Sequence, residues 1–155
     1  MKIDKLKEIK KALDGLATTP TSLALVIARN LSKVNSAIKH ADDDFSEAQK
    51  MIFEKDEKGE AIPYVADQFG NILTEDGKEV LFIKESTRLQ PGQAIVFKFA
   101  DIEAAKKIKE EYASEEHDIQ LNTFNANVLQ QAIDSGAISA DLLVPLIGTI
   151  IPENE

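Results

Sequence analysis

The side chains best suited to catalysis or metal binding in this sequence are two histidines and a run of three aspartates. His40 and His117 lie in different segments, and neither has an acidic or nucleophilic motif of recognised spacing around it. Asp42, Asp43 and Asp44 are consecutive, and consecutive side chains on a helix project about 100° apart, so they do not converge on one ion. We therefore interpret the histidines as surface residues and the aspartates as a solvated acidic patch.

The glycines lack the surroundings that a phosphate-binding loop requires. Those at positions 59, 70, 77 and 92 fall in turn contexts, without a following Gly-Lys-Ser/Thr and without a strand–loop–helix frame. The chain contains no cysteine, which removes disulfides, thiol nucleophiles and thiolate metal ligands and favours the cytosol. We therefore predict a non-enzymatic protein with no catalytic residues, no cofactor and no metal site.

The net charge of −9 is unevenly distributed along the chain. Residues 1–40 carry eight Lys and Arg against three Asp and Glu, whereas residues 41–155 carry ten against twenty-four. The acidic part would repel a phosphate backbone, so we expect no direct nucleic-acid binding. The basic part is either a solvated surface or a contact for an acidic partner, which includes the acidic face of another copy.

Length and hydropathy indicate one globular domain over residues 1–155. Of the residues, 43% are hydrophobic and 29% are charged, which is typical of a folded protein with its own core. No apolar run approaches the roughly 20 residues that a membrane span needs, and the N-terminal lysines are not followed by the apolar segment of a signal peptide. We therefore expect no membrane association.

Apolar residues spaced three and four apart predict a short helix followed by a long one. Residues 3–16 form the first, with Ile3, Leu6, Ile9, Leu13 and Leu16 on one face. The second begins at Thr21 or Ser22, both good N-cap residues, and runs to about Lys55, provided that the three aspartates do not break it. Its apolar positions form a seam suited to packing against another helix: Ala24, Ile27, Leu31, Val34, Ile38, Ala41, Phe45, Ala48 and Ile52.

Residues 56–100 have a different character, because turn signals there separate short runs with strand propensity. Asp76-Gly77 suits a tight hairpin turn, since both central positions of that turn require positive φ. The strand-like runs are residues 61–66, 71–74, 79–84 and 93–99. We predict a small antiparallel β-meander inserted between helices.

The remaining chain is predicted to be largely helical. A third helix covers Asp101–Ser114, with Asp101 as its N-cap, and is the natural antiparallel partner of the long helix. Residues 117–124 are expected to be extended, 127–135 to form a short helix, and 140–147 a final turn or two. The predicted fold is therefore α+β: a long antiparallel helical hairpin (1–55 and 101–155) with an inserted β-meander (56–100) and short C-terminal helices.

Two surfaces are candidates for contacts between chains. The third helix is shorter than the seam of the long helix and cannot cover all of it. The rest of the seam is covered either by residues 3–16 of the same chain or by another chain. The strands of the meander are apolar, and a small sheet needs a partner or a helix to cover its apolar face and offers its edges to other chains. We therefore predict that the meander makes the principal contact with a partner. The alternative is that its phenylalanines pack onto the long helix. The residues of this interface hypothesis are Leu31, Ile38, Phe45, Phe82, Phe97 and Phe99.

The order of these segments resembles a family of uncharacterised small proteins encoded by tailed bacteriophages and prophages. The resemblance covers residues 5–60 and 100–147, whereas residues 61–100 are longer than in that family. The family brings no known catalytic residues, so none is carried over. The motifs that carry the resemblance are Leu6-Lys-Glu-Ile9 with Leu13 and Leu16, Leu25-Val-Ile-Ala-Arg-Asn-Leu31, Phe45-Ser-Glu-Ala-Gln-Lys50, Glu54-Lys-Asp-Glu-Lys-Gly59, and Ile138-Ser-Ala-Asp-Leu-Leu-Val-Pro-Leu-Ile147.

The resemblance implies a phage gene product, in the host cytoplasm or in the virion. Since no catalytic motif is found, the favoured function is that of a virion structural or assembly component that acts through protein–protein contacts. Its expected partners are other copies of itself, as a homo-oligomer, or other phage proteins. The alternative is an accessory protein that binds and inhibits a host factor, with its acidic body mimicking the charge of nucleic acid.

Overall fold

The computed structural model describes residues 1–17 and 22–153 and divides the chain into two compact units. Unit 1 comprises residues 1–44 and 110–155, and unit 2 comprises residues 45–109. Two helices, α2 (Ala24–Met51) and α3 (Ile102–Ser114), each contribute residues to both units. The division between the units therefore falls inside these helices, and not at residues 55 and 100, where the sequence changes character.

Helix α1 (Ile3–Ala17) supplies one side of the core of unit 1. Its predicted apolar face is confirmed, because Ile3, Leu6, Ile9, Leu13 and Leu16 are all buried. They pack in one cluster with residues of α2 and of the C-terminal segments. Each such aliphatic side chain stabilises the fold by about 1.5–3 kcal/mol when it is fully buried.

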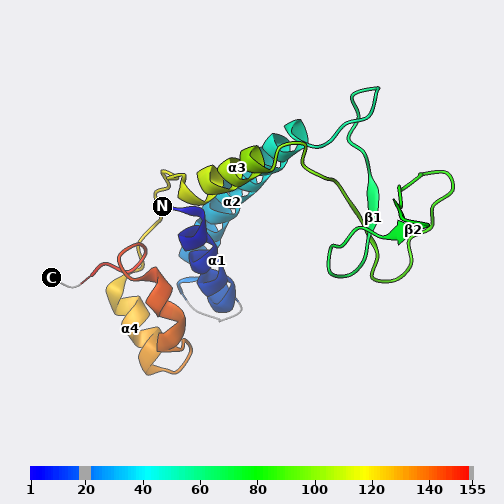
Figure 1. The fold of residues 1–155 in the computed structure, drawn as a ribbon. Helices are drawn as coiled ribbons and strands as arrows, with labels where there is room; N and C mark the ends of the chain where they lie inside the picture. The colour runs from blue at the N-terminus through cyan, green and yellow to red at the C-terminus, as the bar shows by residue number, and fades with distance from the viewer. Residues whose placement is uncertain (18–21, 154–155) are drawn as a thin grey trace. The chain divides into compact units, whose positions relative to one another are not determined.

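Helix α2 is continuous from Ala24 to Met51, as Figure 1 shows. The three aspartates are exposed and do not break it, and Asp43 accepts a hydrogen bond from Lys39 one turn earlier. The helix ends at Met51, short of the predicted Lys55. Of the two predicted N-cap residues, Ser22 lies in the turn before α2 and Thr21 lies outside the described residues.

The buried face of α2 differs from the predicted seam at several positions. Ala24 is exposed and Leu31 only half-buried, whereas Asn30, a polar residue, is completely buried. The side-chain Nδ2 of Asn30 donates to the carbonyl of Asn122 at 2.8 Å, and the backbone N–H of Asn122 donates to Asn30 Oδ1 at 2.8 Å. A side-chain amide can be buried at little cost when both its oxygen and its nitrogen are hydrogen-bonded. Asn30 therefore occupies the buried place in the core that the hydrophobic pattern predicted for Leu31.

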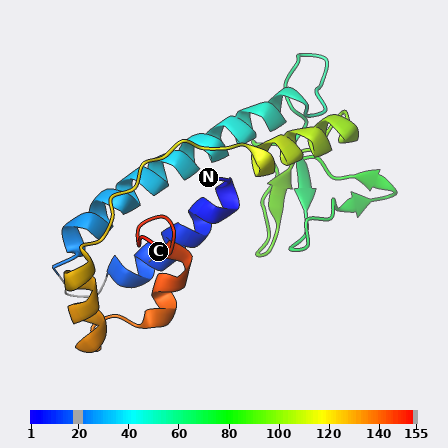
Figure 2. The same ribbon diagram turned by 90° about the vertical axis from the view of Figure 1, so that its left-hand side faces the viewer.

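Helix α3 runs antiparallel beside α2, which confirms the predicted helical hairpin (Figure 1 and Figure 2). Its predicted N-cap is also confirmed, because Asp101 Oδ1 accepts a hydrogen bond from the N–H of Ala104 at 3.0 Å. No described residue of α3 is fully buried, and Ile102 is largely exposed. The apolar contacts of α3 are therefore made by half-buried residues, which include Ala105, Ile108 and Tyr112.

The C-terminal segments complete unit 1. After an extended stretch, α4 (Ala126–Asp134) begins at Asn125, whose side chain accepts from the N–H groups of Asn127 and Val128 at 3.1 and 3.2 Å. The 3-10 helix η1 (Ala140–Leu146) packs against α1. Because α1, α4 and η1 all join the same core cluster, the N-terminal half of the α2 seam is covered within the chain.

Unit 2 contains the predicted antiparallel strands, but their pairing does not follow chain order. Strand β1 (Tyr64–Ala66) pairs with β4 (Ala94–Val96), so the first and last strands are neighbours. On its other side, β1 forms bridges with Ile72 and Leu81, which flank the hairpin of β2 (Thr74–Glu75) and β3 (Lys78–Glu79). Because β1 has neighbours on both sides, its three residues are buried.

The turns of unit 2 are set by local chemistry that the sequence shows directly. Asp76 and Gly77 both have positive φ, of 52° and 76°, which confirms the predicted tight hairpin turn between β2 and β3. In two further turns, Asp56 and Asp67 each accept hydrogen bonds through Oδ1 from the backbone N–H groups two and four residues later, at 2.8 and 3.0 Å in both cases. The two turns are therefore built in the same way.

Candidate interaction surface

The side chains that bind metals in proteins do not form a cluster in the described part of the chain. Among those residues, no group of three His, Asp or Glu side chains could hold a metal ion. His40 is exposed, as expected. His117, which we expected at the surface, is half-buried: its backbone N–H donates to the carbonyl of Met1 at 2.9 Å, and its ring Nε2 finds no hydrogen-bond partner among the described residues.

A polar cluster that the sequence did not indicate joins three helices within unit 1. Lys7 of α1 donates through Nζ to Tyr112 Oη at 2.8 Å, and Tyr112 of α3 donates to Asp42 of α2. Lys7 also lies 3.8 Å from Asp42 Oδ1 and 5.3 Å from the centre of the Tyr112 ring. Because all three side chains are satisfied by one another at the surface of the core, we interpret this cluster as a structural link between the helices.

The cluster leads to a prediction for alkaline pH. Burial and the hydrogen bond to Asp42 raise the pKa of Tyr112 above its ordinary value of about 10, and the hydrogen bond from Lys7 to Tyr112 raises the pKa of Lys7. Both raised pKa values mean that the folded state holds its protons more tightly than the unfolded state. Their contribution to stability is therefore present at neutral pH and is lost as the pH rises above about 10.

A tyrosine titration followed by absorbance checks this prediction. The chain has two tyrosines and no tryptophan, so Tyr64→Phe isolates the signal of Tyr112. We expect Tyr112 to ionise above pH 10 in the folded protein and at its ordinary pKa in urea. Tyr112→Phe should flatten the loss of stability between neutral and alkaline pH. Ionisation of Tyr112 at or below its ordinary pKa in the folded protein would contradict the cluster.

The basic residues near the N-terminus are partly balanced by contacts inside unit 1. Residues 1–40 fold together with acidic residues from the rest of unit 1. Lys7 forms an ion pair with Asp42, and the amino group of Met1 forms one with Glu116 at 3.0 Å. Lys33 Nζ donates a hydrogen bond to the carbonyl of Gln120 at 2.7 Å. Counted over the sequence, unit 1 carries a net charge of −7 and unit 2 only −2, with ten Lys and Arg against twelve Asp and Glu. The net negative charge of the folded chain therefore lies mainly in unit 1.

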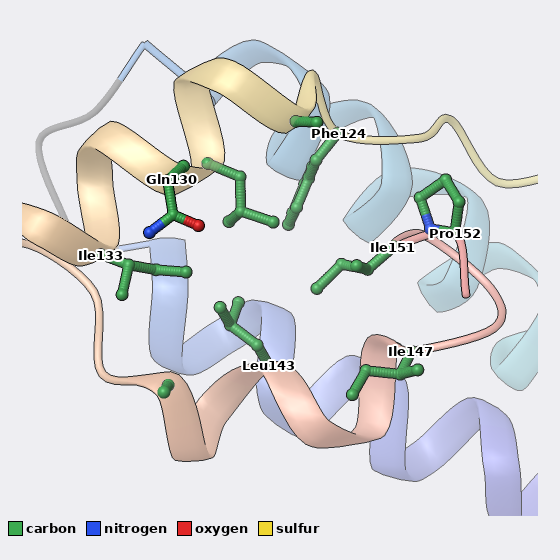
Figure 3. A pocket seen from close by; sticks show the side chains of 10 residues that line it. Phe124, Gln130, Ile133, Leu143, Ile147, Ile151 and Pro152 are labelled. Atoms are coloured by element: carbon green, nitrogen blue, oxygen red, sulfur yellow. The ribbon is translucent and has the colours of Figure 1, made fainter. Parts of the chain in front are cut away.

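A pocket of about 390 Å³ lies within unit 1, between α4, η1 and the chain after η1 (Figure 3). Figure 3 shows the side chains of Leu143, Ile147 and Ile151 facing those of α4 across it. Its lining is aliphatic and aromatic apart from the amide of Gln130, and it contains no acid, base or nucleophile. The pocket can therefore offer apolar contact and one amide, but no group that performs acid–base chemistry.

The sheet of unit 2 has two faces of different chemistry. Cross-strand neighbours share a face, so Tyr64, Leu81 and Val96 lie on one side and Val65 and Ile95 on the other. Lys98 continues the first face, where it pairs with Glu79 and lies 4.7 Å from the centre of the Tyr64 ring. The first face therefore combines this polar cluster with apolar residues, among them Leu81, which is 47% exposed.

We name the second face the phenylalanine face, and define it by Val65, Phe82, Ile95, Phe97 and Phe99, which alternate onto it along their strands. Phe53, just after α2, stacks against it, with ring centres 4.9 Å from Phe97 and 5.5 Å from Phe99. Ile95 and Phe97 are each 39% exposed, although both are large apolar residues. The phenylalanine face therefore combines an aromatic stack with apolar groups open to solvent.

The six residues of the interface hypothesis are thus divided between the two units. Phe97 and Phe99 both stack against Phe53 on the phenylalanine face of unit 2, and the alternation of side chains assigns Phe82 to the same face. Leu31 and Ile38 belong to unit 1, where Ile38 is buried in the core and Leu31 packs against it; Phe45, at the start of unit 2, is half-buried. The sequence hypothesis did not include Ile95, although the alternation of residues 93–99 places it on the same face as Phe97 and Phe99.

Comparison with known proteins adds no relative: no family model matches the chain, and no curated protein or solved structure does. The described helices include none that is long and apolar enough to cross a membrane.

Proposed function

We propose that this protein acts without catalysis, through protein–protein contacts made by the phenylalanine face, as a structural or assembly component of a phage virion. The observation that supports the contact is the exposure of Ile95 and Phe97 beside the Phe53 stack. Aromatic residues are enriched, and charged residues depleted, in the buried centres of protein interfaces. The virion setting rests on the resemblance of residues 5–60 and 100–147 to small phage proteins.

The distribution of charge supports unit 2 as the contact region. A net charge of −2 over residues 45–109 opposes close approach of another protein much less than the −7 of unit 1. The charged pair on the opposite face of the sheet, Lys98 with Glu79, is satisfied within the chain. A partner that covers the phenylalanine face can therefore leave this ion pair intact.

Retention in purified, salt-washed phage particles tests this function. We expect the wild-type protein to remain in the particles and Ile95→Asp to be released, because the substitution places a charge in the apolar contact. Loss of one buried isoleucine contact should weaken binding by at least about tenfold. Phe69→Asp is a matched control, because Phe69 is in the same unit, is 78% exposed and lies in a turn off the phenylalanine face.

Two outcomes would contradict the proposal in different ways. Equal retention of Ile95→Asp and the wild type would remove the phenylalanine face from the contact. Absence of the wild-type protein from salt-washed particles would contradict the virion role and favour an accessory protein directed at a host factor. Circular dichroism of both variants should match the wild type, which separates loss of contact from loss of fold.

A further inference from the structure

The outer edge of strand β4 is the feature of unit 2 with the clearest unused bonding capacity. The N–H and C=O of Val65 bond to Val80 and Leu73, on the side of β1 that faces away from β4. In an antiparallel pair, the residues on either side of Val65 must then exchange hydrogen bonds with β4. The backbone groups of Ala94 and Val96 therefore point inward, toward β1. The same inward direction continues further along the strand, where the N–H of Glu54 donates to Lys98 at 2.8 Å and the N–H of Ala100 to Ile52 at 2.8 Å.

The odd-numbered residues of the same strand therefore point outward. Ile95, Phe97 and Phe99 direct their backbone N–H and C=O groups away from β1, and among the described strands β1 is the only neighbour of β4. These groups form the row of donors and acceptors with which an edge strand recruits another strand.

This edge also lacks the features that usually protect an edge strand from pairing. Proteins block such edges with lysine, proline, a bulge or a covering segment. The five residues from Gln93 to Phe97 include no charged residue and no proline. Their two outward residues, Ile95 and Phe97, are the exposed apolar groups of the phenylalanine face. Sequence and backbone thus both favour pairing of this edge.

We propose that β4 pairs antiparallel with β4 of a second copy of this chain, which joins two sheets edge to edge; this inference rests on the proposed function and names the partner at the same surface. A copy of the chain supplies a strand of matching length and polarity. Unit 2 is nearly neutral, so two copies meet there with little long-range repulsion.

A two-fold axis at Val96 describes the pairing. Each Ile95 then forms a hydrogen-bonded pair with Phe97 of the second copy, and each of these exposed side chains covers the other. Val96 lies opposite its own counterpart in a non-hydrogen-bonded pair, where the two Cα atoms are about 4.5 Å apart. Lys98 is not placed opposite another lysine in this register, because it faces Ala94 of the second copy.

Cysteine crosslinking tests the pairing directly, because the chain has no cysteine of its own. Under mild oxidation, Val96→Cys should form a disulfide-linked dimer of twice 17.1 kDa, since the expected separation lies within the range of disulfides. Phe69→Cys, in an exposed turn, should remain monomeric under the same conditions and controls for random collision. Failure of Val96→Cys to crosslink above the level of Phe69→Cys would overturn the proposal.

Proline at the outward position provides a second, independent test. Ile95→Pro removes an N–H group that points away from β1, so the sheet of unit 2 should remain folded. Sedimentation should show a dimer for the wild type and a dissociation constant at least about tenfold higher for Ile95→Pro, because two hydrogen bonds are lost per dimer. A wild-type monomer throughout the micromolar range would overturn self-pairing. If Ile95→Asp were still released from particles in that case, the proposed function would stand with a different partner.

Discussion

Replacing Val34 by aspartate should reduce the free energy of unfolding by about 4 kcal/mol, because it places an unpaired charge in a dry core. Val34 is 0% exposed and lies in the cluster where α2 packs against α1 and the C-terminal segments. Urea denaturation followed by circular dichroism measures the change. The position is more informative than Leu31, which is half-buried and can turn a new carboxylate toward solvent.

The matched control is Asn35→Asp, on the exposed side of the same turn of α2. It introduces the same charge and should change stability by no more than about 0.5 kcal/mol. Lys33 is a poorer control, because its Nζ donates to the carbonyl of Gln120. Equal midpoints of denaturation for Val34→Asp and Asn35→Asp would contradict the packing of α2 against α1.

Asn30→Ala should be the second most costly substitution, at about 2–4 kcal/mol. It removes both hydrogen bonds to Asn122 and leaves a half-buried backbone N–H and C=O without their partner, in addition to the space left by the side chain. The extended segment that follows α3 should then loosen from α2. Asn35→Ala, which removes an exposed amide from the same helix, should cost little.

Hydrogen exchange distinguishes this mechanism from general destabilisation. In Asn30→Ala, the amide of Asn122 should exchange through local opening, well before the amides of α1. In the wild type, its bond to Asn30 Oδ1 should give it protection close to that of the core. Uniform acceleration of all amides of unit 1, without a distinct effect at Asn122, would show that Asn30 acts only as a packing residue.

Several features of this protein have causes that lie within a few residues, and these could be predicted from the sequence. The buried face of α1, the Asp101 cap and the Asp76-Gly77 turn were all predicted correctly, because helical periodicity, side-chain capping and positive φ are local constraints. The antiparallel pairing of α2 with α3 was also predictable, since both helices carry apolar positions at matching spacing.

Other features depend on residues far apart in the chain and could not be predicted from the sequence. Asn30 appears polar in sequence and is buried because Asn122, ninety-two residues away, satisfies it. Lys7, Asp42 and Tyr112 form a cluster only when three helices meet. Likewise, β4 lies at the edge of the sheet because β1 is its only neighbour among the described strands, while the 72–81 segment pairs with the other side of β1. Strand order and the cost of burying a polar group are set by long-range contacts, so neither hydropathy nor spacing could reveal them.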